Sequence, residues 1–155
     1  MRSFVLFGLI ICSLVFLSAC TLIQNFMVVN SSGEEIEIEY ELKDSAFEYG
    51  KSIFLPERTS ISNFTTWRIF QKEWEKMPTE QYSFDKNTKI FKVKIKPYEV
   101  VKIAWADPSH IRESGDKTID LKTLRINGNN KEIYFENSKK LLEEFKKNDF
   151  QIIYR

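Results

Sequence analysis

The stretch Glu35-Ile36-Glu37-Ile38-Glu39-Tyr40-Glu41-Leu42 decides the fold class of this chain. Its strict alternation places four apolar side chains on one face of an extended strand and four glutamates on the other. Turn-forming residues, Asn-Ser-Ser-Gly at 30–33, stand just before it. The pattern therefore predicts a half-buried β-strand that pairs with residues 24–29 as a hairpin.

Further segments have the character of strands and are separated by turn residues. Asn127-Gly128 is the strongest short hairpin signal in the chain, because this dipeptide adopts the tight turns that join paired strands. Several short strands of this kind predict a mainly β fold, which we expect to be an antiparallel, immunoglobulin-like β-sandwich with one or two short helices. The additional strand candidates are residues 91–96, 99–106, 121–126, 132–136 and 150–154.

One helix is predicted close to the carboxyl end of the sequence. Ser138 can cap it, and Leu141, Leu142 and Phe145 form its apolar stripe. Asn148 is a suitable residue to end it.

A second helix is predicted over residues 66–76 and would be ended by Pro78. Thr65-Thr66 and Ile69 would also suit a strand, so the segment has two possible structures. The helical interpretation rests on apolar residues that recur at helical spacing, namely Phe64, Trp67, Phe70, Trp74 and Met77.

The first twenty residues have the three regions of a secretory signal: Arg2, an apolar run from Phe4 to Leu17, and then small residues. A membrane-spanning helix needs about 20 apolar residues, which is more than this run supplies. Leu17-Ser18-Ala19-Cys20 resembles the lipobox of bacterial lipoproteins. The resemblance implies that Cys20 is lipidated and becomes the first residue of the mature chain.

This resemblance gives an expected division of the chain. Residues 1–19 would be the lipoprotein signal peptide, residues 20–23 a short lipidated tether, and residues 24–155 a single β-sandwich domain. The protein would be held in a membrane by its lipid and would face the periplasm or the exterior. In a cell with an outer membrane, that membrane is the expected location.

Composition narrows the possible partners. The chain has 23 basic and 22 acidic side chains, and loss of Arg2 with the signal would make it neutral. No overall field then favours nucleic acid. Cys12 would leave with the signal and Cys20 would carry the lipid, so we expect a domain held together by its core, without disulfides or cofactors.

Two stripes of like charge are the first candidate site. If the two strands are neighbours, opposite charges on facing residues stabilise the sheet, and the stripes form an ordinary solvated face. The other interpretation is a docking surface for a charged partner such as an envelope protein or a polymer, and the sequence fits both. The stripes are Glu35, Glu37, Glu39 and Glu41 on one strand, and Lys92, Lys94 and Lys96 on another.

The loop of residues 107–117 holds the single histidine and is the second candidate. In a small hydrolase His110 could act as a base, oriented by Asp107 or Asp116, with Ser109 or Ser114 as nucleophile. The chain lacks the Gly-x-Ser-x-Gly elbow, and one histidine with scattered carboxylates lacks the spacing of a zinc or calcium site. A polar surface loop explains the same residues.

The three tryptophans, Trp67, Trp74 and Trp105, are the third candidate. Exposed tryptophans on a sandwich could stack on sugar rings, whereas buried ones fill the core. Trp105 shares the apolar face of its strand with Val101 and Ile103, so we expect it to be buried.

These patterns favour a lipid-anchored, non-catalytic binding or assembly module of the cell envelope. Its partners would be the membrane, through Cys20, and another envelope protein or a glycan. Two alternatives stay open: an inhibitor or immunity lipoprotein that blocks a toxin or lytic enzyme, and a small hydrolase centred on His110.

Overall fold

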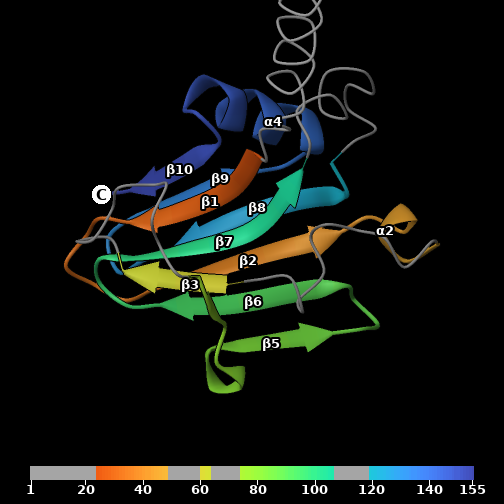
Figure 1. Ribbon diagram of the computed structural model, residues 1–155. Helices are drawn as coiled ribbons and strands as arrows, with labels where there is room; N and C mark the ends of the chain where they lie inside the picture. The colour runs from red at the N-terminus through yellow and green to blue at the C-terminus, as the bar shows by residue number, and fades with distance from the viewer. Residues whose placement is uncertain (1–23, 49–59, 64–73, 107–118) are drawn as a thin grey trace, which may run out of the picture.

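The computed structural model describes residues 24–48, 60–63, 74–106 and 119–155 (Figure 1). The signal and tether at 1–23 and the loop at 107–117 lie outside the described residues. The elements are β1 (Gln24–Asn30), β2 (Ile36–Leu42), α2 (Ser45–Glu48), β3 (Ser60–Asn63), β4 (Glu75–Lys76), η3 (Thr79–Gln81), β5 (Tyr82–Asp85), β6 (Ile90–Ile95), β7 (Glu99–Ala106), β8 (Leu121–Asn127), β9 (Glu132–Phe135), α4 (Ser138–Lys147) and β10 (Gln151–Tyr154).

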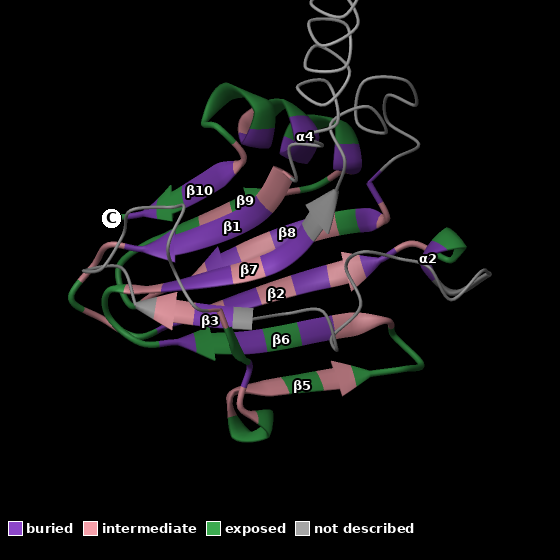
Figure 2. Cartoon of the chain, viewed as in Figure 1, coloured by how far each residue is buried: buried purple, intermediate pink, exposed green. Residues whose placement is uncertain are grey.

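Two five-stranded sheets form the domain, so the expected mainly β, sandwich-like fold is confirmed. Sheet A has the strand order β10-β1-β7-β3-β4, and sheet B has the order β5-β6-β2-β8-β9. The inward side chains of both sheets meet in one apolar cluster, which appears in Figure 2 as alternating buried positions along the strands. Pairing is antiparallel except between β1 and β10, which run parallel. The immunoglobulin-like detail stays a prediction.

The stretch that predicted the fold is the central strand of sheet B. In β2 the apolar residues from Ile36 to Leu42 are buried at every second position, and the glutamates between them are half-buried. Tyr40 packs against Phe91 of β6 with ring centroids 4.9 Å apart. The alternation therefore sets both the strand and its orientation.

The expected hairpin between residues 24–29 and 35–42 is wrong. β1 lies in sheet A between β7 and β10, whereas β2 lies in sheet B between β6 and β8. The reason is that β1 is apolar on both faces: Phe26 and Val28 face the main core, and Met27 and Val29 belong to a second buried cluster. A strand buried on both faces takes a central position, with neighbours along both edges.

The chain crosses between the two sheets at Asn30, whose side chain is fully buried. Its Nδ2 donates to the carbonyl oxygens of Glu34 at 2.7 Å and Lys96 at 3.0 Å. Its Oδ1 accepts from the backbone N–H of Ser32 at 3.1 Å and from the Ser32 hydroxyl at 2.6 Å. The turn residues thus change sheets instead of closing a hairpin.

Helix α4 was predicted at the correct place but with the wrong cap. Asn137 is the N-cap, and its side chain accepts a hydrogen bond from the backbone N–H of Lys140. Ser138 is buried, and its hydroxyl donates to the carbonyl oxygen of Leu121 at 2.6 Å. Asn148 is the C-cap, as expected. The apolar stripe is buried, and Phe145 meets Phe26 edge-on at 5.0 Å.

The other local predictions have different outcomes. The hairpin around Asn127-Gly128 is confirmed, since β8 and β9 pair with Asn127 opposite Glu132. The predicted helix over residues 66–76 is wrong at its end, because Glu75–Lys76 is strand β4 and pairs with β3. Residues 64–73 lie outside the described part of the chain.

Candidate functional site

The outer face of sheet B brings the two charged stripes together. Glu37 is the register partner of Lys94, and Glu39 is the partner of Lys92, because β2 and β6 are adjacent and antiparallel. Their buried neighbours, such as Ile38 and Val93, point into the core and fix the charged side chains outward. The neighbouring-strand interpretation of the stripes is therefore confirmed, although Glu35 precedes β2 and Lys96 follows β6.

Along its other edge β2 pairs with β8, and this pairing adds Arg125 and its neighbours on β9 to the charged face, which was not predicted from the sequence. Glu39 is also the register partner of Arg125, and Arg125 is in turn the partner of Tyr134 on β9. The guanidinium of Arg125 lies 4.8 Å from the Tyr134 ring centroid and its Nε is 3.2 Å from Glu132 Oε1. The position of Arg125 between buried Leu124 and Ile126 was the available signal for this face.

Ion pairs occupy the middle of this face and the end of β2 near Leu42. Lys92 Nζ lies 2.7 Å from Glu39 Oε2, and this hydrogen bond, with the charge of Glu39, raises the pKa of Lys92. Lys122 Nζ lies 2.6 Å from Glu41 Oε1, a hydrogen bond that raises the pKa of Lys122. Exposed pairs of this type contribute only about 0.2–1 kcal/mol each, so they organise the surface more than they stabilise the fold.

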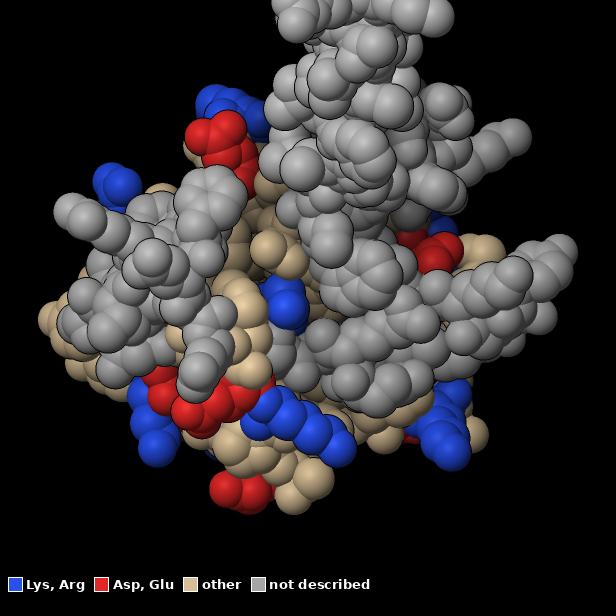
Figure 3. Space-filling view, in the orientation of Figure 1, with Lys and Arg blue, Asp and Glu red and all other residues tan. Residues whose placement is uncertain are grey.

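The amino-terminal end of β2 differs from the middle. Lys94 and Glu37 face each other across the strands, yet neither makes an ion pair within the described residues. Exposed Glu35 and Lys96 extend this end of the face and likewise make no ion pair there. We call Glu35, Glu37, Lys94 and Lys96 the unpaired end of the face. Figure 3, drawn in the orientation of Figure 1, shows acidic and basic side chains side by side along the lower edge of the molecule.

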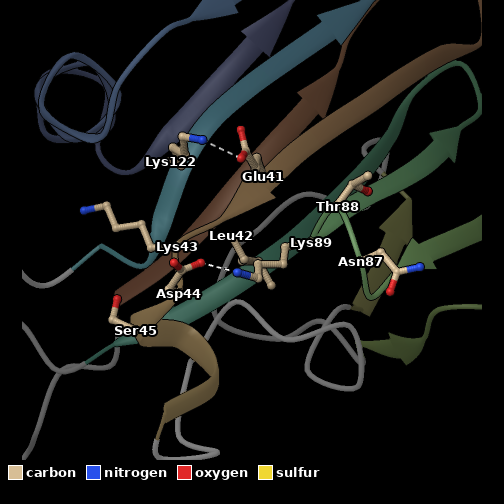
Figure 4. A pocket seen from close by; sticks show the side chains of 9 residues that line it. All are labelled: Glu41, Leu42, Lys43, Asp44, Ser45, Asn87, Thr88, Lys89 and Lys122. Carbon is tan, nitrogen blue, oxygen red and sulfur yellow. Dashed lines mark hydrogen bonds and ion pairs between the residues drawn. The ribbon is translucent and has the colours of Figure 1, made fainter.

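A polar hollow of about 560 Å³ lies at the opposite end of β2 (Figure 4). The Glu41–Lys122 pair lines one side of it, and Lys89 bonds to Asp44 on another, which lowers the pKa of Asp44. Ser45 donates from its hydroxyl to Asp120 Oδ1 at 3.2 Å. The described lining holds no histidine or cysteine; it comprises Glu41, Leu42, Lys43, Asp44, Ser45, Asn87, Thr88, Lys89 and Lys122.

The tryptophans divide between the described and undescribed parts of the chain. Trp74 is half-buried and packs on the second cluster, which consists of Met27, Val29 and Val100. The Lys102 ammonium lies 4.8 Å from its ring centroid, and burial lowers the pKa of Lys102. Trp105 lies in β7, where its backbone is the register partner of Asn25 in β1, but the Trp105 side chain is not among the described ones. Trp67 also lies outside the described residues.

The remaining sequence candidates are not placed by the structure. Cys20 and the hydrolase residues Asp107, Ser109, His110, Ser114 and Asp116 lie outside the described residues. Within the residues that the structure describes, no group of three or more His, Cys, Asp or Glu side chains could hold a metal ion. The helices of this described part are all too short or too polar to cross a membrane.

Comparison of the chain with protein-family models, with curated proteins and with solved structures found no match.

Proposed function

We propose that this chain is a lipid-anchored, non-catalytic binding or assembly protein of the cell envelope, held in the membrane through Cys20. The lipobox-like sequence supports the anchor. The observation that carries the binding role is the unpaired end of sheet B, where two glutamates and two lysines on or next to β2 and β6 make no ion pair among the described residues.

Rigidity favours this face as a docking surface. β2 is hydrogen-bonded along both edges, and its inward side chains from Ile36 to Tyr40 are no more than 1% exposed. Side chains on such a strand lose little backbone freedom when a partner binds. The mixed charges suit a partner with acidic and basic groups of its own, for which electrostatic complementarity fixes the docking register.

The division between paired and unpaired charges indicates where the partner binds. Lys92 and Glu39 already satisfy each other, so a partner would have to break their bond before using either group. Lys94 and Glu37 make no ion pair among the described residues, so a partner can bind them without first breaking one. We therefore place the contact at the unpaired end, and the partner is another envelope protein.

The test is cross-linking in intact cells that express the tagged full chain, followed by affinity capture and mass spectrometry. Lys94→Glu is the perturbation, and Lys146→Glu, at an exposed position of helix α4, is the matched control. We expect the wild type and the control to capture the same discrete protein, and Lys94→Glu to lose at least about 90% of it, because like charges replace complementary ones. Equal capture by both variants would refute this face as the contact.

The anchor is tested separately with Cys20→Ala. We expect this variant to leave the membrane fraction while keeping the thermal unfolding midpoint of the wild type, since the lipid adds anchoring without contributing to the core. A Cys20→Ala chain that stays membrane-bound would refute the anchor and leave the docking face to be judged by the Lys94→Glu result.

A further inference from the structure

Strand β10 is an edge of sheet A, and its hydrogen bonds show which backbone groups face outward. Met27 donates from its N–H to the carbonyl oxygen of Phe150 at 3.0 Å, and Ser31 donates to that of Tyr154 at 2.9 Å. In a parallel pair, every second residue directs its N–H and C=O to the same neighbour. Residues 150, 152 and 154 therefore face β1, and Gln151, Ile153 and Arg155 face away from it.

On the outward edge of β10, the first backbone donor is already hydrogen-bonded, and the groups that follow it have no described strand as partner. Gln151 donates its N–H to the carbonyl oxygen of Asn148 at 3.0 Å, so this donor is already used. The Gln151 carbonyl, both backbone groups of Ile153 and the Arg155 N–H point to the open side, where no described strand pairs with them. Edge strands are commonly protected by lysine, proline or a bulge, and β10 has none of these.

The outward donors and acceptors of one β10 strand match those of a second β10 strand. When two β10 strands run antiparallel with Ile153 opposite Ile153, the two isoleucines exchange two hydrogen bonds. Each Arg155 N–H then meets the Gln151 carbonyl of the other strand. This register uses all four open groups and does not need the occupied Gln151 N–H.

The side chains favour the same register. Ile153 is 37% exposed, although its register partner on β1, Val29, is fully buried. Self-pairing covers this isoleucine with its own copy. In this register Arg155 of one chain lies opposite Gln151 of the other, so no like charges face each other across the pair.

We infer that the partner at this edge is a second copy of the chain, which joins two copies of sheet A into one continuous sheet. The arrangement is a closed two-fold dimer, because both copies use the same edge, β10, and this edge is then fully paired. This inference does not depend on the proposed docking face, which lies on sheet B.

Disulfide trapping tests the register directly. The Cα atoms of a hydrogen-bonded antiparallel pair are about 5.5 Å apart, which lies within the range that a disulfide spans. The experiment uses the full chain in membranes, with Cys12→Ser in every variant. Ile153→Cys is compared with Ser83→Cys, an exposed position on β5, and with the parent that keeps only Cys20.

Under a mild oxidant we expect Ile153→Cys to form a disulfide dimer at least about tenfold faster than Ser83→Cys or the parent. Equal rates would overturn the inference. A disulfide between Cys at position 153 and a different protein would also overturn it, since that result would identify another occupant of the edge.

Sedimentation of the purified full chain in detergent provides the second measurement. Ile153→Lys places two like charges opposite each other and should raise the dimer dissociation constant at least about tenfold. Ser83→Lys, at an exposed position on β5 of sheet B, should leave it unchanged. A wild type that stays monomeric at ~100 μM, or a dimer that Ile153→Lys does not weaken, would contradict the proposed pairing.

Discussion

Replacing Asn30 by alanine tests how the two sheets are held in place. The Asn30 side chain is fully buried where the chain leaves sheet A, and it bonds to the carbonyl oxygen of Lys96, just after β6 of sheet B. It also bonds to the Glu34 carbonyl and to two groups of Ser32. Alanine removes these four hydrogen bonds, and a longer one of 3.5 Å to the Ile95 carbonyl oxygen, without removing apolar surface from the core.

The expected magnitude follows from the geometry. Each hydrogen bond contributes about 0.5–1.5 kcal/mol net, and a buried group left without its partner costs about 1–3 kcal/mol. Ser32 is half-buried, so water replaces part of what it loses, whereas the Glu34 and Lys96 carbonyls lose donors that come from inside the fold. We therefore expect Asn30→Ala to lower the free energy of unfolding by about 2–4 kcal/mol.

Urea unfolding of the full chain in mild detergent, followed by tryptophan fluorescence, measures this loss. Asn129→Ala is the matched control, because Asn129 is exposed and uses its backbone N–H to bond Glu34. Asn30→Asp keeps an acceptor for Ser32 but places a second oxygen against the two carbonyls, so it should be at least as destabilised as Asn30→Ala. A loss below about 0.5 kcal/mol in Asn30→Ala, or wild-type stability in Asn30→Asp, would show that the Asn30 side chain does not hold the two sheets in place.

Two further predictions concern the residues around Glu34, where the crossing segment reaches sheet B. Gly128→Ala should cost about 1–3 kcal/mol, because its Cβ would lie 2.0 Å from the Tyr154 hydroxyl, while Gly33→Ala, with nothing within 4 Å, should be neutral in the same thermal unfolding assay. Equal midpoints for the two variants would contradict this. Burial, with the hydrogen bond to Glu34, raises the pKa of Tyr154 above 10.0, so its contribution is present below pH 10 and is lost as pH rises through the folded-state pKa. Stability measured from about pH 8 to 11 should therefore fall more steeply for the wild type than for Tyr154→Phe, and parallel curves would show that Tyr154 does not titrate with unfolding.

Local patterns predicted the elements well where one face is buried and the other is wet. The alternation of Ile38 and Tyr40 with glutamates set the orientation of β2, and the Asn127-Gly128 signal correctly predicted the hairpin of β8 and β9. Helix α4 followed from its apolar stripe, but its cap did not, because both Asn137 and Ser138 are good caps and the buried bond from Ser138 to Leu121 decided between them.

Partner strands were harder to predict because pairing depends on contacts between residues far apart in the chain. Turn residues 30–33 look the same whether a chain folds back beside itself or crosses to a second sheet. The parallel pairing of β1 with β10 joins the first and last described strands, and no local signal marks it.

The sequence alone determined the mainly β class, the positions of most strands, and the two charged stripes, because these depend on alternation within single segments. The lipobox-like expectation for Cys20 also comes from the sequence alone. Tertiary structure decided which charges pair: Lys92 reaches Glu39, whereas Lys94 and Glu37 make no ion pair among the described residues. It also decided that β10 ends sheet A with backbone groups that no described strand pairs. Both outcomes depend on strand order, which is set by how two sheets bury a shared core and is not encoded in any one strand.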